Sequence, residues 1–334
     1  MWRHCAWLVL LAAVMGCSGN TGNPPSMPMD SGAAAAGKHY HIAVIPKAST
    51  HEFWKSVHAG AENAAKELGN VTILWKAPAH DDDRAEQINL VQDFVTRGVD
   101  GICLAPIDSQ ALINTVRDTK KSGIPTVIFD SGLNDLNLYV SYVATDNENG
   151  GRLAAREMGK RLNGKGNVIL LRYNPGSEST EMRERGFLET IAKEFPDIKI
   201  LSSDQYAGVS EQTALDKGQQ LLLKYGKDVN GIFAVNETSA TGMLRALDEA
   251  GLTKKIVYLG FDSSDRMVRA LRDGTIQGVV LQDPVNMGYQ SVKAMVAQLN
   301  GQPVDKRIPT GEAIATSENM DDPQIHKLLN PEQY

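Results

Sequence analysis

The chain has 334 residues, of which 42% are hydrophobic and 22% charged, and this composition suits one large or two medium-sized globular domains. Its formal net charge is −6, and no stripe of Lys and Arg stands out, which argues against a nucleic-acid partner. Aromatic residues make up only 6% of the chain, so any cluster of them is informative.

The first residues are typical of an export signal. Arg3 precedes an apolar run that is too short to span a membrane. The run ends in the letters VMGC, which resemble a bacterial lipobox. We therefore expect residues 1–16 to be a lipoprotein signal peptide, Cys17 to be lipidated, and the Gly-, Pro- and Ser-rich residues 17–38 to form a flexible tether. A plain signal peptide with an incidental Cys is the alternative.

From residue 40 onward, short apolar runs alternate with segments of helical periodicity. The apolar runs predict strands at 42–46, 71–75, 100–105, 125–129, 139–144, 168–172, 198–202, 230–235, 256–261 and 277–282. The periodic segments predict helices at 53–68, 84–97, 110–122, 148–162, 180–194, 210–225, 239–250 and 286–299. Short apolar strands joined by amphipathic helices indicate parallel sheets covered on both faces.

The second half of this region repeats the first. The segment GVDGICLAPIDS (98–109) matches DVNGIFAVNETS (228–239), and IPTVIFDSG (124–132) matches IVYLGFDSS (256–264). Two tandem copies of one βα unit predict an α/β fold of two similar doubly wound parallel-sheet lobes. Ligand contacts in such sheets lie beyond the carboxyl ends of the strands, so we expect two rims that face each other across a cleft.

Polar and aromatic side chains follow the predicted strand ends and the start of one helix. The candidate ligand contacts are His51, Phe53, Trp54, Asp130, Thr145, Asn147, Arg185, Asn236, Asp262 and Gln282. Carboxylates, amides and an arginine suit the vicinal hydroxyls of a polyhydroxyl ligand, and an aromatic face suits the apolar face of a sugar ring.

Several of these residues have a structural alternative. Asp130, Asp262 and Asn236 also suit turn or helix caps, His51 suits a solvated loop, and one of the two adjacent aromatics suits the core. The same helix start carries Arg183, and since side chains two residues apart point in different directions, we expect Arg185 to be the ligand contact.

Motifs for catalysis or metal binding are missing from the sequence. It has no GxSxG, HExxH, P-loop or strand-following GxGxxG, and no CxxC pair. The three aspartates at 81–83 lack the spacing of a calcium loop, so we expect them to form a loop face and not a metal site. We therefore expect a protein that is not an enzyme and that has no cofactor and no metal.

The motifs together resemble those of the ribose-type sugar-binding proteins of bacterial ABC importers, whose type I periplasmic binding fold is shared with the cores of LacI-like repressors. The resemblance covers nearly all of residues 40–315, and its markers are HEFW, GVDGICLAPID, IPTVIFD, VATDNENGG, RERGF, IFAVNE, YLGFDSS and QDP. It implies stacking by Phe53 and Trp54 and polar contacts by the other candidates. Three departures argue against ribose: His51 replaces an Asn, Ser131 replaces an Arg, and the third aromatic has no clear match, although Tyr206 and Val209 lie nearby.

The resemblance also implies how the lobes are assembled. Three strands are expected to cross between them, near 143–146, 281–284 and 308–311. Lobe one would then comprise residues 39–144 plus 283–309, and lobe two 145–282 plus 310–334. A hinge of three strands permits rigid-body closure around a ligand.

The expected function is a lipid-anchored substrate-binding protein of an ABC importer, outside the cytoplasm, which captures a sugar or related polyol. Its expected partners are the permease membrane subunits and, through the lipid anchor, the membrane; we expect a monomer. A sensor that presents the sugar to a chemoreceptor or histidine kinase is the alternative. The export signal and the missing N-terminal helix-turn-helix argue against a repressor, and the missing catalytic motifs against an exported sugar-modifying enzyme.

Overall fold

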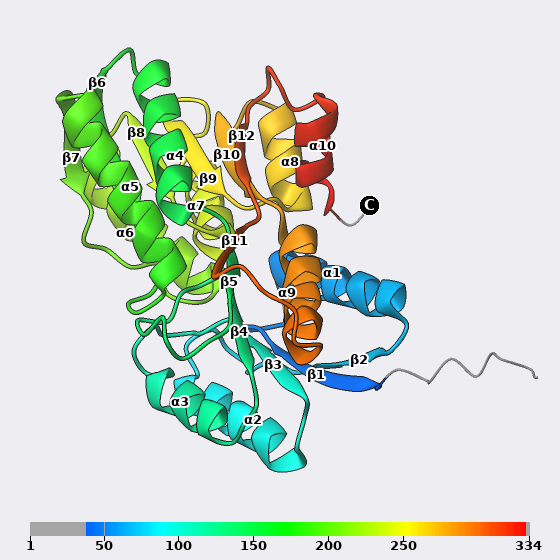
Figure 1. Ribbon diagram of the computed structural model, residues 1–334. Coiled ribbons are helices and arrows are strands. Elements are labelled where there is room, and N and C mark those ends of the chain that lie inside the picture. Colours follow the sequence, from blue (N-terminus) through cyan, green and yellow to red (C-terminus); the bar gives the residue numbers. More distant parts are fainter. Residues whose placement is uncertain (1–37, 50, 332–334) are drawn as a thin grey trace, which may run out of the picture. The chain divides into compact units, whose positions relative to one another are not determined.

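The computed structural model describes residues 38–49 and 51–331 (Figure 1). The expected signal peptide, Cys17 and the tether up to residue 37 lie outside the described residues. No helix in the described part of the chain is long and apolar enough to cross a membrane.

The described residues form two six-stranded sheets, and we call the parts built on them lobe one and lobe two. The strand order is β11-β5-β4-β3-β1-β2 in lobe one and β12-β10-β9-β8-β6-β7 in lobe two. The strands of lobe one are β1 (Tyr40–Ile45), β2 (Val71–Trp75), β3 (Gly101–Leu104), β4 (Thr126–Phe129), β5 (Tyr142–Ala144) and β11 (Arg307–Pro309). Those of lobe two are β6 (Lys165–Leu171), β7 (Asp197–Ser202), β8 (Gly231–Ala234), β9 (Val257–Phe261), β10 (Gly278–Gln282) and β12 (Glu312–Ala315). All pairings are parallel except that of β12 with β10.

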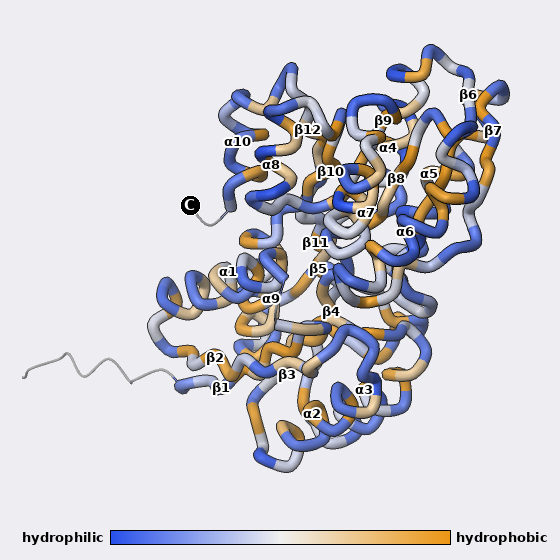
Figure 2. Tube along the Cα trace, turned by 180° about the vertical axis from the view of Figure 1, so that it is seen from behind, coloured by the Kyte–Doolittle hydropathy of each residue, from blue (hydrophilic) through white to orange (hydrophobic). Residues whose placement is uncertain are grey.

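Helices cover both faces of each sheet. They are α1 (Glu52–Leu68), α2 (Arg84–Arg97), α3 (Ile113–Lys121), α4 (Asn147–Arg161), α5 (Glu178–Glu194), α6 (Glu211–Tyr225), α7 (Glu237–Glu249), α8 (Asp265–Arg272), α9 (Pro284–Leu299) and α10 (Pro323–Leu329). Each sheet has one hydrophobic cluster on either face, and the hydrophobic stretches of Figure 2 follow the strands and the inner faces of the helices. The predicted fold class, two similar doubly wound parallel-sheet lobes, is confirmed.

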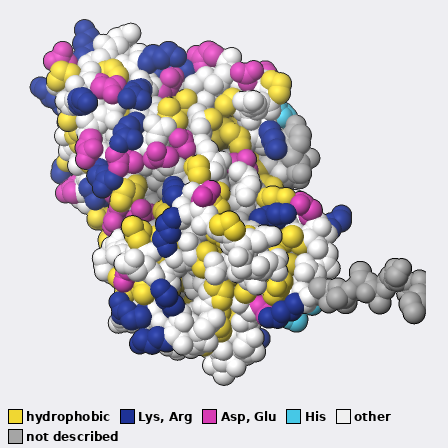
Figure 3. Space-filling model, in the orientation of Figure 1, with side chains coloured by type: hydrophobic (Ala, Val, Ile, Leu, Met, Phe, Trp, Pro, Cys, Tyr) yellow, Lys and Arg dark blue, Asp and Glu magenta, His cyan; other side chains and the backbone are white. Residues whose placement is uncertain are grey.

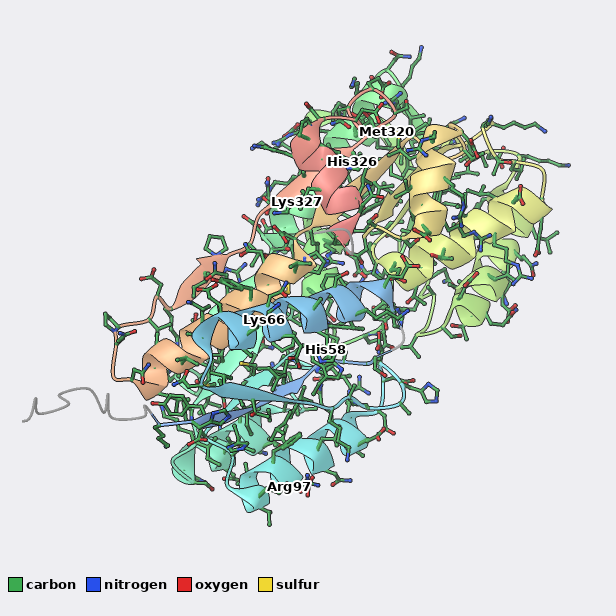
Figure 4. All side chains as sticks on the ribbon, turned by 90° about the vertical axis from the view of Figure 1, so that its right-hand side faces the viewer. His58, Lys66, Arg97, Met320, His326 and Lys327 are labelled. Atoms are coloured by element: carbon green, nitrogen blue, oxygen red, sulfur yellow. The ribbon has the colours of Figure 1, made fainter. Side chains whose placement is uncertain are left out.

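All ten predicted strands and all eight predicted helices are present, with ends shifted by a few residues. The sequence interpretation missed α8, α10 and β12, and it treated β11 only as part of a crossing. The two helices have eight and seven residues, and the two strands have three and four. The two helices carry few helical periods, and the two strands lie at sheet edges and are mostly exposed or half-buried, so they lack the buried apolar run that marks the short central strands. Helices α8 and α10 lie on the same side of the molecule as α1 and α9, as the positions of His326 and Lys66 show (Figure 4).

The chain crosses between the lobes after β5 and again after β10. After β5 it enters lobe two, where α4 packs on α5, and after β10 it enters lobe one, where α9 packs on α1. In both helix pairs the two backbones are in direct contact. A Cβ atom at Gly151 would lie 2.0 Å from the carbonyl oxygen of Arg183, and one at Gly288 would lie 2.0 Å from that of Val57. Glycine is therefore required at both contacts, and each fixes the helix that begins beside the cleft.

Candidate functional site

A cavity lies between the lobes, where the carboxyl ends of their strands face each other. It encloses about 370 Å³, including the space at its mouth. Lobe one contributes Lys47, His51, Phe53, Trp54, Asp81 and Asp130 to its lining. Lobe two contributes Tyr173, Ser177, Ser179, Thr180, Arg183, Asn236, Glu237, Asp262 and Gln282. This volume is at the small end of the range for ligand sites and suits a molecule of monosaccharide size.

Two aspartates occupy equivalent positions in the two halves of the repeat. Asp130 follows β4 and Asp262 follows β9, and both have left-handed backbone conformations, with φ of 61° and 70°. This conformation costs free energy for a residue with a Cβ atom, although Asp and Asn tolerate it best. Both side chains are buried on the cavity wall, so the same strained turn aims a carboxylate into the cleft from each lobe.

Lys47 neutralises the first aspartate. It is 4% exposed, and its Nζ lies 3.0 Å from Asp130 Oδ2. The same Nζ donates hydrogen bonds to Ser177 Oγ and Ser179 Oγ of lobe two, both at 3.3 Å. Lys47 therefore links the lobes. The sequence analysis did not select it, although a lysine just beyond the end of the first strand was a readable signal.

Arg183 neutralises the second aspartate. Its Nη1 lies 3.9 Å from Asp262 Oδ2, and its guanidinium carbon lies 3.7 Å from the ring centroid of Phe261. Its Nε donates to Asn147 Oδ1 at 2.9 Å, and its Nη1 donates to the carbonyl of Val235 at 2.9 Å. Burial raises the pKa of Asp262, and the nearby Arg183 opposes this rise. Asn147, Val235 and Phe261 thus hold the arginine on the cavity wall.

Arg185, the arginine chosen from the sequence, lies outside the cavity. Its side chain is 47% exposed and pairs with Glu148, whereas that of Arg183 is 2% exposed. The physical reason is the buried face of α5. Arg183 lies three and four residues before Gly186 and Phe187, which pack inward, and Arg185 points away from them.

Two more predicted contacts lie one layer behind the lining. Thr145 is fully buried and donates from Oγ1 to Gln282 Oε1 at 2.8 Å, and Gln282 in turn donates to Asp262 Oδ1 at 2.6 Å. Asn147 holds Arg183, as described above. Thr145 and Asn147 therefore position the lining residues Gln282 and Arg183 and do not themselves line the cavity.

The other predicted residues line the cavity, and some of them also have the alternative structural role. Asn236 caps α7, because its Oδ1 accepts from the backbone N–H of Ser239 at 3.2 Å. Phe53 and Trp54 meet edge to face at 4.8 Å between ring centroids. Both rings belong to the hydrophobic cluster between α1, α9 and the lobe-one sheet, so they border the cavity and the core at once.

The loop at 81–83 also contributes to the cavity. Asp81 lies in the loop between β2 and α2 as expected, but it is only 6% exposed and lines the cavity, which the interpretation as a loop face did not foresee. Tyr173 of lobe two donates from its hydroxyl to Asp81 Oδ2 at 2.5 Å. Tyr173 is also the aromatic residue that lobe two contributes to the lining, whereas Tyr206 lies against Arg172 outside it.

Glutamates cap helices across the cleft in both directions. Glu237 at the start of α7 accepts from the backbone N–H groups of Glu52 and Phe53, at 3.3 and 3.1 Å. Glu52 accepts from the backbone N–H of Asp265 at 3.1 Å, which caps α8 in lobe two. Burial raises the pKa of Glu237 to about 7, and His51 opposes this rise. These contacts hold the lobes together in the closed arrangement.

A larger opening adjoins the cavity and shares Phe53, Asp262 and Gln282 with it. It encloses about 690 Å³, and residues 328–331 form one wall. Ser263 Oγ holds that wall by donating to the carbonyl of Leu329 at 2.6 Å. The C-terminal segment therefore packs on lobe two beside the cleft.

On the face shown in Figure 3, charged side chains of both signs are interspersed over the two lobes.

The sequence profile described as "periplasmic binding protein domain" matches residues 42–303. The chain belongs to this family. It is 31% identical to the D-apiose import binding protein of Paraburkholderia graminis over 252 residues, which cover 75% of this chain and 78% of the relative. It is 30% identical to the ribose import binding protein of Haemophilus influenzae over 269 residues, which cover 80% and 88%.

Solved structures of family members agree. An ABC transporter solute-binding protein from Agrobacterium vitis with bound D-fucose is 34% identical, with a TM-score of 0.83 over 86% of this chain and 99% of the other. A carbohydrate transporter solute-binding protein from Agrobacterium radiobacter, in complex with D-arabinose, is 33% identical, with a TM-score of 0.84 over 87% and 99%. The resemblance to ribose-type sugar-binding proteins is confirmed, and the named relatives of this periplasmic binding protein serve sugar transport and are not enzymes.

Proposed function

We propose that this protein is the lipid-anchored substrate-binding protein of an ABC importer, which works outside the cytoplasm and captures a monosaccharide or related polyol between its lobes. The observation that carries the proposal is the pair of strained, equivalent aspartates, one from each lobe, each beside a buried cation. Carboxylates held in this way accept hydrogen bonds from sugar hydroxyls, while the cations keep the buried charge balanced. The apiose, ribose, fucose and arabinose named for the relatives belong to the same ligand class.

Ribose itself is not the ligand we propose. Ser131 stands where the family's ribose binders have an arginine, and its Oγ lies 3.2 Å from Ser179 Oγ of lobe two and accepts from the Ser179 backbone N–H at 3.0 Å. The side chain thus joins the two lobes through Ser179, whose Oγ also accepts from Lys47 Nζ at 3.3 Å. The cation beside this contact is therefore Lys47 and not an arginine at position 131, and this different donor geometry suits a hexose or a differently hydroxylated pentose.

Capture follows from contacts that both lobes make only when closed. Glu178 of lobe two accepts from the backbone N–H of Gly132 at 2.8 Å and from the Tyr142 hydroxyl at 3.0 Å in lobe one. A ligand that contacts both rims adds to these interlobe contacts, so its binding favours the closed form. The permease would then receive the closed, loaded protein, and the tether would keep that protein close to it.

The test is binding followed by uptake. The purified full chain is titrated calorimetrically with D-apiose, D-ribose, D-fucose, D-arabinose and D-allose, with Asp130→Ala plus Asp262→Ala as the control. We expect one sugar to bind and to raise the stability by about 2.7 kcal/mol at 100 times its Kd, and the double variant to lose both effects. Binding of no sugar would refute the sugar assignment. Binding without loss of uptake in a strain that lacks the gene would favour the sensor alternative.

A further inference from the structure

Asp81 carries an oxygen atom that the fold leaves without a partner. Its Oδ1 is buried and has no hydrogen-bond partner among the described residues, although its Oδ2 accepts from the Tyr173 hydroxyl. Three other buried side-chain oxygens of the described chain share this state, but only that of Asp81 belongs to a residue that lines the cavity. A buried carboxylate oxygen without a donor is costly, so its presence on a cavity wall points to a donor on the ligand.

The charges around the cavity single out the same residue. Asp130 has Lys47 at 3.0 Å and Asp262 has Arg183 at 3.9 Å, so each of these aspartates has a cation on the wall. Asp81 has no Lys or Arg partner in the described chain, and the closest basic atom is His51 Nε2 at 3.8 Å from Oδ2. Among the three aspartates of the lining, Asp81 is therefore the one whose carboxylate has no Lys or Arg beside it in the described residues.

Both lobes build this part of the wall. Asp81 belongs to the loop between β2 and α2 of lobe one, while Tyr173 follows β6 of lobe two. His51 of lobe one lies with its Nδ1 3.0 Å from Thr238 Oγ1 of lobe two. Tyr173 orients Oδ2, which leaves Oδ1 for another partner. The arrangement is therefore complete only when the lobes are closed.

We propose that Asp81, oriented by Tyr173 and flanked by His51, forms a donor-selective subsite that reads one hydroxyl or amino group of the captured sugar. The inference rests on the proposed function and deepens it by naming the ligand class. Neutral sugars and amino sugars satisfy Oδ1. Sugar acids and sugar phosphates are rejected when their anionic group faces Asp81, because that group brings a second negative charge next to the carboxylate and has no hydrogen to donate.

The test compares Asp81→Asn with Asp82→Asn. The two substitutions make the same chemical change at adjacent positions, and Asp82 is exposed. The full chain, each variant and Tyr173→Phe are titrated with the bound sugar of the panel, with each of its monodeoxy analogues and with its amino analogues. The melting temperatures of all four proteins are measured alongside, so that an unfolded variant is recognised.

We expect one deoxy position to behave unlike the others. Removing the hydroxyl that faces Asp81 should weaken binding to the wild type and to Asp82→Asn about 10- to 100-fold, but to Asp81→Asn less than 3-fold. Tyr173→Phe should show an intermediate loss, since Oδ2 is then no longer held. The analogue with an amino group at that position should bind the wild type as tightly as the parent sugar or more tightly. Its affinity should fall more than that of the parent sugar in Asp81→Asn.

Two outcomes would overturn the subsite, and they are separable from failure of the proposed function. If Asp81→Asn and Asp82→Asn rank all analogues as the wild type does, Asp81 reads nothing on the ligand. If every deoxy analogue binds more weakly than the parent sugar by the same factor in all four proteins, then water and not the sugar satisfies Oδ1 of Asp81. If the wild type binds no sugar at all, the proposed function fails and the subsite fails with it.

Discussion

At the scale of single residues, the cavity is lined by buried charged groups that contribute both to the stability of the fold and to ligand binding. Lys47 lies between Asp130 in its own lobe and two serines in the other. A buried ion pair adds little net stability, but the loss of one partner leaves an uncompensated buried charge. The site should therefore be sensitive to single substitutions and tolerant of matched double ones.

Substitution of Lys47 by Met should destabilise the protein by about 3–5 kcal/mol, because it leaves the Asp130 carboxylate buried beside an apolar chain. Asp130→Asn should have a similar cost, since it leaves the ammonium group unpaired. The double variant should recover a large part of the loss. Denaturant unfolding of the four proteins in the absence of sugar measures this coupling.

Lys55→Met serves as the control. Lys55 is an exposed lysine in the first turn of α1 and follows the cavity residues Phe53 and Trp54 in the sequence. It should change the free energy of unfolding by less than about 0.5 kcal/mol. If Lys47→Met cost no more than this control, or if the two cleft substitutions were simply additive, the pair would not be coupled as the geometry requires.

How much of this site the sequence could predict depends on where each residue stands relative to a strand end. His51, Asp130, Asn236, Asp262 and Gln282 were placed on the rim from strand positions alone, and all line the cavity. Lys47 was missed although its position beyond a strand end was readable. Asp81, in contrast, depends on a distant partner, because Tyr173 of the other lobe donates to its carboxylate and no local pattern reports such a contact. Arg183 was distinguishable from Arg185 by the buried face of its helix, which is a local signal.

At the scale of elements, the closed arrangement is held at helix N-termini. Glu237 satisfies two backbone N–H groups of α1, and Glu52 satisfies one of α8. The first turn of a helix leaves such groups without intrahelical partners and carries partial positive charge, so a carboxylate there is favourable. Each lobe thus supplies a cap for a helix of the other, and opening the cleft exposes both ends.

The elevated pKa of Glu237 makes closure pH-dependent. In the closed form this pKa is about 7, against 4.5 for the free side chain. An acid whose pKa is raised contributes fully to the closed form below 4.5 and loses that contribution as the pH rises through 7. Sugar affinity measured by calorimetry should therefore fall as the pH rises from about 4.5 to about 7. The fall should be about tenfold for each pH unit over which Glu237 is ionised in the open form and protonated in the closed form.

Glu237→Gln should flatten this profile, because the amide cannot ionise but still accepts from the α1 backbone. Glu184→Gln is the control, since burial also raises the pKa of Glu184 to about 7 although it does not line the cavity. The control should alter the pH dependence of the melting temperature and leave that of sugar affinity unchanged. A profile that stays steep in Glu237→Gln would assign the pH dependence to a group other than Glu237.

At the scale of the whole molecule, the repeat explains both the architecture and the position of the cleft. Strands β5-β4-β3-β1-β2 and β10-β9-β8-β6-β7 have the same order, so the carboxyl ends of equivalent strands line the cleft from both lobes. The repeat was readable because it spans more than a hundred residues in each copy. Strands β11 and β12 were not readable as a pair, because they lie on the edges of two different sheets and are mostly exposed or half-buried, so neither forms a buried apolar run.

The folded body and the expected anchor are separate parts of the chain, and this separation yields the last prediction. Cys17 lies in the sequence before the first described residue, Lys38, and every residue of the cavity lies after it. In a Gram-negative host, wild-type protein should fractionate with membranes and incorporate a labelled fatty acid, because the lipobox-like ending directs acylation of Cys17. Cys17→Ser should appear in the soluble periplasmic fraction without label and with unchanged sugar affinity. Cys103→Ser, which alters the buried free cysteine, should retain the label. Wild-type protein that is soluble and unlabelled would show that the signal is an ordinary one, and a Cys17→Ser variant that stays with the membrane would show that another segment anchors the chain.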